Sequence, residues 1–99
     1  MIKIKVTEND IIVSGHAMYE EYGKDIVCAA VSSVITTAVE IAANFDSSSV
    51  DLSEYDDKLE IIINKHDDIT NKIINTMLSL LSELEAQYPK NIKITNKEE

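Results

Sequence analysis

Five short stretches of this chain have the apolar pattern of strands, and in most of them apolar and polar residues alternate with the period of two that gives a strand one buried face. We therefore expect strands at residues 2–6, 11–14, 50–53, 58–64 and 91–95. The pattern is clearest in the fourth stretch, where Leu59, Ile61 and Ile63 share one face. A polar turn at residues 8–10 indicates that the first two strands form a hairpin.

Two longer segments carry apolar residues at helical spacing, and each has one apolar stripe. The first helix is expected to begin at Ile26 and to end before Asp46, and Pro89 is expected to stop the second. The first stripe consists of Val27, Val31, Val34, Ile35, Ala38, Ile41, Ala42 and Phe45. The second stripe consists of Ile69, Ile73, Met77, Leu80, Leu81, Leu84 and Tyr88. Both stripes are expected to pack against the sheet.

The order ββαββαβ predicts an α+β fold, a two-layer sandwich in which two helices cover one face of a largely antiparallel sheet. We expect one domain over residues 1–95 and a frayed tail at 96–99. The other face of the sheet is expected to be wet. Ile12 and Ile62 point to that face, either as part of an interface or as incidental surface residues.

The net charge and the cysteine count limit the kinds of binding partner and the cellular compartment that we expect. The net charge of −9 argues against direct binding to nucleic acid, which needs a surface of Lys and Arg. The same charge suits a basic protein partner, or serves solubility alone. A single cysteine excludes an internal disulfide framework and fits the cytoplasm. No signal peptide and no apolar run of about 20 residues is present, so no membrane contact is expected.

The segment Gly15–Ser32 carries the candidate chemistry, because it holds the only cysteine and one of the two histidines. Asp25 is a plausible N-cap, which would place Cys28 in the first turn of the helix. Backbone N–H groups there stabilise a thiolate and can bind an oxyanion. His16, twelve residues earlier, is a candidate base. Asp25 could instead orient His16, and Cys28 could simply be a small buried hydrophobe.

The residues Gly15-His16-Ala17, Gly23 and Asp25 to Ser32 together resemble the motif of the bacterial ribosomal-processing cysteine protease (Prp) family. The resemblance implies that Cys28 is the nucleophile and His16 its base. It also implies a cysteine endopeptidase that removes the N-terminal extension of a large-subunit ribosomal protein, cutting before a small residue at the mature start. Members of that family are small cytoplasmic homodimers without a metal, and no cofactor is expected.

Other residues near this motif have weaker assignments. Ser32, one turn beyond Cys28, could line the site or bond back to helix carbonyls. The loop at residues 17–24 is a candidate for substrate binding. Its apolar candidates are Met18, Tyr19 and Tyr22, and its acidic candidates, facing a basic ribosomal protein, are Glu20 and Glu21.

Motifs of several other chemistries are absent, among them a phosphate-binding glycine loop, HExxH and CxxC. His66, Asp67 and Asp68 are expected to start the second helix rather than to hold a metal. Asp56 and Asp57 are expected to form a solvated turn. Two rival functions remain: a ribosome-associated binding module with an inert Cys28, and a redox sensor, which the lack of a resolving cysteine weakens.

Overall fold

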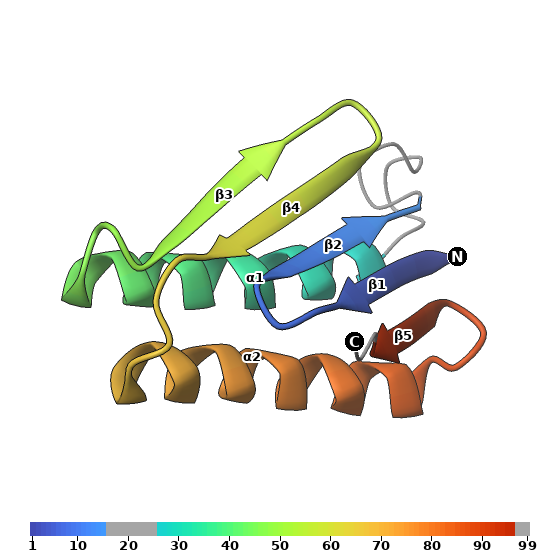
Figure 1. The fold of residues 1–99 in the computed structure, drawn as a ribbon. Coiled ribbons are helices and arrows are strands. Elements are labelled where there is room, and N and C mark those ends of the chain that lie inside the picture. The colour runs from blue at the N-terminus through green and yellow to red at the C-terminus, as the bar shows by residue number, and fades with distance from the viewer. Residues whose placement is uncertain (16–25, 97–99) are drawn as a thin grey trace.

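Two helices cover one face of a five-stranded sheet in the computed structural model, which describes residues 1–15 and 26–96 (Figure 1). The elements, in chain order, are β1 (Ile2–Val6), β2 (Asp10–Ser14), α1 (Ile26–Phe45), β3 (Val50–Glu54), β4 (Lys58–Ile63), α2 (Asp68–Gln87) and β5 (Ile92–Asn96). The predicted order ββαββαβ and the α+β class are therefore confirmed.

The strands lie in the order β3-β4-β2-β1-β5. The pairs β1–β2, β2–β4 and β3–β4 are antiparallel, whereas β1 and β5 pair in parallel. β5 extends to Asn96, which pairs with Val6, so the last strand runs one residue further than expected. The parallel pair arises because α2 carries the chain across one face of the sheet and returns it beside the N-terminal strand.

The core lies between the sheet and the helices. The strands contribute Ile4, Ile11 and Ile61, which are fully buried, in agreement with the alternating pattern of the sequence. α1 is rich in β-branched residues, which lower intrinsic helix stability, so its packing on the sheet stabilises it more than its propensity does. Among the described residues, α1 alone is long and apolar enough to span a membrane by length and composition, a test that core helices also pass.

One sequence-based expectation about the helices is wrong. Four residues assigned to the inward stripes are exposed by 42% to 66%: Ile41, Phe45, Ile69 and Leu80. Residues at the centre of each stripe, such as Ile35 on α1 and Leu81 on α2, are fully buried. Residues at the edges of a stripe turn toward the neighbouring helix or outward, because each step along a helix rotates the side chain by about 100°.

Residues close in the sequence set both ends of α2. The Asp67 carboxylate accepts a hydrogen bond from the Thr70 N–H at 3.0 Å and caps the first turn. At the other end, the Tyr88 N–H donates to the Leu84 carbonyl, and Pro89 follows directly. The expected stop at Pro89 is therefore confirmed.

Candidate active site

Cys28 is the third residue of α1 and lies in its first turn. The side chain is 4% exposed and belongs to the hydrophobic core beside Val27 and Val31. The thiol thus sits where the positive end of a helix meets the core. At such a place, backbone N–H groups favour a negative charge while neighbouring apolar side chains exclude water.

The first turn of α1, Ile26–Ala29, contains no acidic residue. Since the N–H groups of a first turn have no partner within the helix, they can stabilise a thiolate or bind an oxyanion. A carboxylate within this turn would oppose that effect by repelling the thiolate. The described part of the site is therefore suited to nucleophilic chemistry at sulfur.

Gly15 fixes where the chain leaves β2 toward His16. Its φ of +111° lies in a region that side chains with a Cβ rarely adopt. A Cβ at this position would approach the carbonyl oxygen of Met1 to 2.3 Å and the Cα of Ile2 to 3.0 Å. Glycine is thus required both by the backbone angle and by the neighbouring strand, which explains the first residue of the motif in structural terms.

The family model of the cysteine protease Prp matches residues 1–93. This chain belongs to the Prp cysteine protease family. A ribosomal processing cysteine protease Prp of Staphylococcus aureus is 34% identical to it over 107 aligned positions, which cover 98% of this chain and all of the relative. The enzyme class expected from the motif, a cysteine protease, is therefore confirmed.

Two crystal structures of an essential Prp from Staphylococcus aureus have the same fold. The structure with a covalently linked product peptide has a TM-score of 0.85 and 32% identity, and the structure with a substrate peptide has a TM-score of 0.85 and 31% identity. Each alignment covers 98% of this chain and 100% of the other. The two-layer sandwich described above is thus an architecture that can carry a Prp active site.

Several predicted site residues lie outside the described residues, so their roles stay predictions. They are His16, Met18, Tyr19, Glu20, Glu21, Tyr22 and Asp25. Ser32 is described: it is half-buried and lies one helical turn beyond Cys28 on α1. That placement keeps both of its predicted roles open.

The second histidine of the chain has a structural partner. His66 Nε2 lies 2.9 Å from the Oδ1 atom of Asn9, in the turn between β1 and β2. Asp67, next to it, caps α2, and hydrogen bonds from Thr70 lower the pKa of the Asp67 carboxyl below its ordinary value. Within residues 1–15 and 26–96, no group of three or more metal-ligating side chains comes together. Asp56 and Asp57 are exposed in the turn between β3 and β4, as expected.

A groove of about 440 Å³ runs between α1 and α2, and Cys28 is not among its lining residues. Its apolar lining includes Val34 and Ile41 of α1 and Ile73 and Leu80 of α2. The sequence analysis missed this groove because it assigned these residues to the core.

Proposed function

We propose that this protein is an endopeptidase that removes the N-terminal extension of a large-subunit ribosomal protein precursor. The observation that carries the proposal is Cys28 in the first turn of α1, within a chain matched from residue 1 to residue 93 by the Prp family model. The similar Staphylococcus aureus enzyme, bound covalently to a product peptide, supports a mechanism through a covalent intermediate.

In the proposed mechanism, His16 takes the proton of the Cys28 thiol, and the sulfur attacks the scissile carbonyl carbon. The carbonyl oxygen gains negative charge, and the N–H groups of the first turn of α1 stabilise it. His16 then gives the proton to the leaving amine, so that the peptide bond breaks and a thioester remains on Cys28. Water, deprotonated by His16, hydrolyses the thioester and restores the thiol.

The finer features of the proposal concern specificity. The cut lies before a small residue at the mature start, and Met18, Tyr19 and Tyr22 contact apolar side chains of the extension. Glu20 and Glu21 face the basic body of the precursor. Asp25 caps α1 or orients His16, and Ser32 lines the site. The net charge of −9 supports a basic protein as the substrate and opposes direct binding to nucleic acid.

The proposal also includes a cytoplasmic homodimer that makes no membrane contact and needs no metal or other cofactor. A cysteine–histidine pair activates its own nucleophile and so needs no Lewis acid for acyl transfer. A chain with one cysteine and no disulfide framework suits a reducing compartment.

One observation favours a second candidate, a ribosome-associated binding module. Cys28 is only 4% exposed, and inert cysteines are commonly buried in this way. Such a module would bind the precursor without cutting it, and its thiol would react slowly with alkylating reagents. A redox sensor would instead have a fast thiol and no cleavage.

The test is mass spectrometry of the precursor ribosomal protein from the same genome, incubated with the wild-type protein or with Cys28→Ala. We expect one cut by the wild type that leaves a small residue at the new N-terminus, and an intact precursor with the variant. An intact precursor in both samples, together with co-elution of the two proteins, would contradict the protease and support the binding module.

A further inference from the structure

The two faces of the sheet differ in what covers them. Alternate residues of the strands are buried beneath the helices, so the residues between them form the opposite face, called the open face below. On this face β1 and β5 carry lysines and no acidic residue, whereas the acidic residues lie on β2, β3 and β4. The lysines are Lys3, Lys5 and Lys93, and the acidic residues are Asp10, Asp51 and Glu60.

The three lysines Lys3, Lys5 and Lys93 are called the basic strip below. All three side chains are exposed, and they are three of the nine lysines and arginines in a chain of net charge −9. Within the part of the chain that the structure describes, none of them takes part in an ion pair. Lys58, on β4 of the same face, has a partner, since its Nζ atom lies 5.1 Å from the centre of the Tyr55 ring.

The arrangement of the basic strip is unfavourable without a partner. Lys3 and Lys93 are directly opposite each other in the parallel pair of β1 and β5. Like charges at opposed positions repel each other and destabilise a sheet. Lys5 lies two residues along the same face of β1, at about 7 Å from Lys3. An anion bound over the strip replaces this repulsion by attraction, so the strip is suited to a ligand with several negative charges.

Two apolar residues lie beside the basic strip. Ile12 and Ile62 are half-buried on the open face, where the sequence allowed either an interface or incidental surface residues. Ile12 is opposite Lys5, and Ile62 lies on the neighbouring strand β4, opposite Asp10. Side chains at such diagonal positions on adjacent strands are within reach of each other. The open face therefore combines an apolar centre with a charged side, which is the usual anatomy of a protein-binding surface.

We propose that the open face binds an acidic segment of another protein, whose carboxylates pair with the basic strip and whose apolar side chain contacts Ile12 and Ile62. The proposal does not rest on the protease function and adds a second surface to the protein. A short extended segment fits the strip, because its alternate side chains are also about 7 Å apart and follow β1 from Lys3 to Lys5. Charge complementarity with the strip therefore selects the segments that bind.

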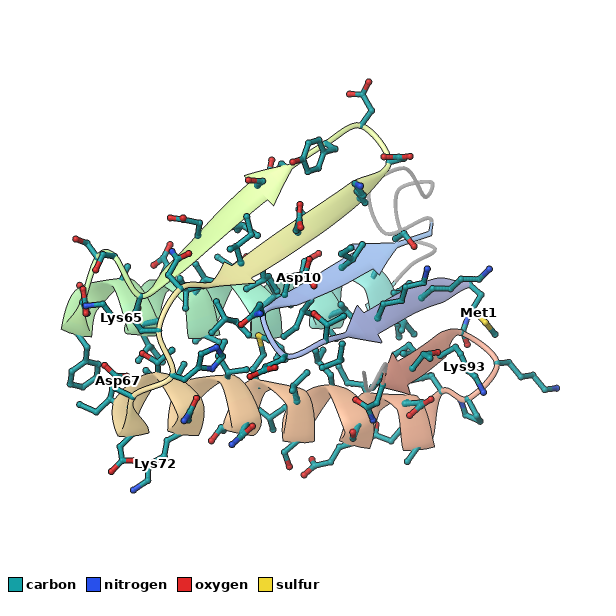
Figure 2. All side chains as sticks on the ribbon, in the orientation of Figure 1. Met1, Asp10, Lys65, Asp67, Lys72 and Lys93 are labelled. Carbon is teal, nitrogen blue, oxygen red and sulfur yellow. The ribbon has the colours of Figure 1, made fainter. Side chains whose placement is uncertain are left out.

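The open face and the thiol lie on opposite sides of the sheet. Cys28 is buried in the core, on the helix side. Met1 and Lys93 lie together at one end of the sheet, and Asp10 lies nearer the other end (Figure 2). Met1 is also close to Gly15, where the chain leaves β2. A partner on the basic strip is therefore near Gly15 but is separated from Cys28 by the sheet, so that binding and cleavage can be measured independently.

RNA is the main alternative occupant of the open face. Its backbone would extend beyond the three lysines onto the acidic half of the same face, where Asp10 and Glu60 repel phosphates. Proteins that hold single strands also stack the bases on aromatic side chains, and none of the five described strands contains one. A short acidic segment of a protein fits the strip without meeting the acidic half, so the charge pattern favours it over RNA.

Fluorescence anisotropy at low salt, with a labelled peptide of aspartates around one central leucine, tests the basic strip. Replacing Lys3 and Lys93 together by Gln should raise the dissociation constant at least about tenfold, because both charges face the peptide. The matched control replaces Lys65 and Lys72 by Gln and changes the net charge equally. Lys65 pairs with Asp46, and Lys72 points from α2 away from the strands (Figure 2), so we expect a change of less than about twofold.

A second variant tests the apolar centre of the open face. Ile62→Thr keeps a β-branched residue on β4 and should raise the dissociation constant several-fold for the peptide with leucine, but not for a peptide of aspartates alone. Circular dichroism checks that every variant keeps the fold. Cleavage of the precursor by the variant without Lys3 and Lys93 should stay within about twofold of the wild type, because the sheet separates the strip from Cys28.

Four results contradict the binding of an acidic segment. They are the absence of saturable binding, an equal effect of the two pairs of lysine substitutions, tighter binding of an oligouridylate through Lys3 and Lys93, and a dimer that loses its association when these two lysines are replaced. The last result would assign the open face to a second copy. A variant that loses cleavage together with binding would place the lysines in the active site and contradict a separate surface. Wild-type protein that binds the peptide but does not cut the precursor contradicts the protease alone.

Discussion

α1 and α2 have the same length and pack on the same face of the sheet, yet their first turns, as far as the structure describes them, differ in charge. α2 starts with carboxylates: Asp67 caps it, and Asp68 lies in the first turn. The first turn of α1 holds Cys28 and no acidic residue. The positive end of a helix can stabilise either a structural carboxylate or a reactive anion. In this protein one helix does the first, and α1 is suited to the second.

The segment that leads into α2 is held by structural hydrogen bonds. Before α2, each polar residue has a structural partner: Asn64 donates to Asp51, Lys65 pairs with Asp46, His66 lies against Asn9, and Asp67 accepts from Thr70. The Lys65 ammonium and Ser48 lower the pKa of Asp46 to about 2. His16, before α1, has the predicted role of a base. A variant of His66 can therefore serve as the control for a variant of His16.

The largest effect on activity is expected when each of the two histidines is replaced by alanine in turn. His16→Ala should abolish turnover and slow alkylation of Cys28 near neutral pH, because the imidazolium no longer stabilises the thiolate. His66→Ala should leave both rates within about twofold, since His66 contacts Asn9 rather than the active site. Iodoacetamide kinetics from pH 5 to pH 9 measure the difference. Identical profiles for the wild type and His16→Ala would show that the pair does not exist.

A smaller effect is expected from giving α1 the acidic first turn of α2. Ala29 is exposed and follows Cys28 directly in the first turn, and the carboxylate of Ala29→Asp should disfavour the thiolate by repulsion. Alkylation at pH 7 should then fall by up to about tenfold. Ile69→Asp makes a similar change at the exposed start of α2 and should not alter the rate. Equal rates for all three proteins would mean that the field of the helix does not act on Cys28.

The acidic residues before α1 should affect only the encounter with the substrate. Replacing Glu20 and Glu21 by Gln should raise the apparent KM for the full precursor a few-fold at low salt. The effect should vanish near 1 M salt, where the Debye length is about 3 Å. Replacing Asp56 and Asp57 by Asn removes the same charge from the turn between β3 and β4 and should have little effect. If both pairs act alike, the charge of the chain serves solubility alone.

The smallest effect on activity is expected at the cap of α2. Asp67→Ala should lower the melting temperature by a few degrees and leave kcat unchanged, because the variant loses the bond to Thr70 far from Cys28. The pKa of Asp67 lies below its usual 3.8 in the folded protein. Its stabilisation is therefore complete above the usual pKa and is lost as the pH falls through the lowered one. Melting temperatures of the two proteins should differ at pH 6, and the difference should shrink as the pH falls below the usual pKa; a constant difference would contradict the charged cap.

Local patterns in the sequence predicted the strands and helices, whereas the pairing of distant strands could not be predicted from them. Strands and helices followed from periods of two and 3.6, because each element has one face toward a shared core. The parallel pairing of β5 with β1 joins distant segments, and no local pattern specifies it. The exposure of Ile41 and Leu80 was missed for a related reason. Periodicity gives the direction of a stripe, but its edges are buried only if another helix or chain covers them.

The candidate site was predictable only in part. The position of Cys28 in the first turn followed from the start of the apolar stripe near Ile26. The strict need for glycine at Gly15 did not, since it depends on the approach of Met1 from a neighbouring strand. The partner of His66 could not be predicted either, because Asn9 is far away in the sequence.

The most direct test of the reactive N-terminus of α1 is the rate at which Cys28→Ala cuts the precursor under single-turnover conditions. Alanine fills the buried site with a smaller side chain and leaves the helix intact, so the variant should fold. We predict that cleavage falls at least about 1,000-fold, as when other covalent nucleophiles are removed. A rate within tenfold of the wild type, in a variant whose circular dichroism spectrum is unchanged, would contradict the assignment of Cys28 as the nucleophile.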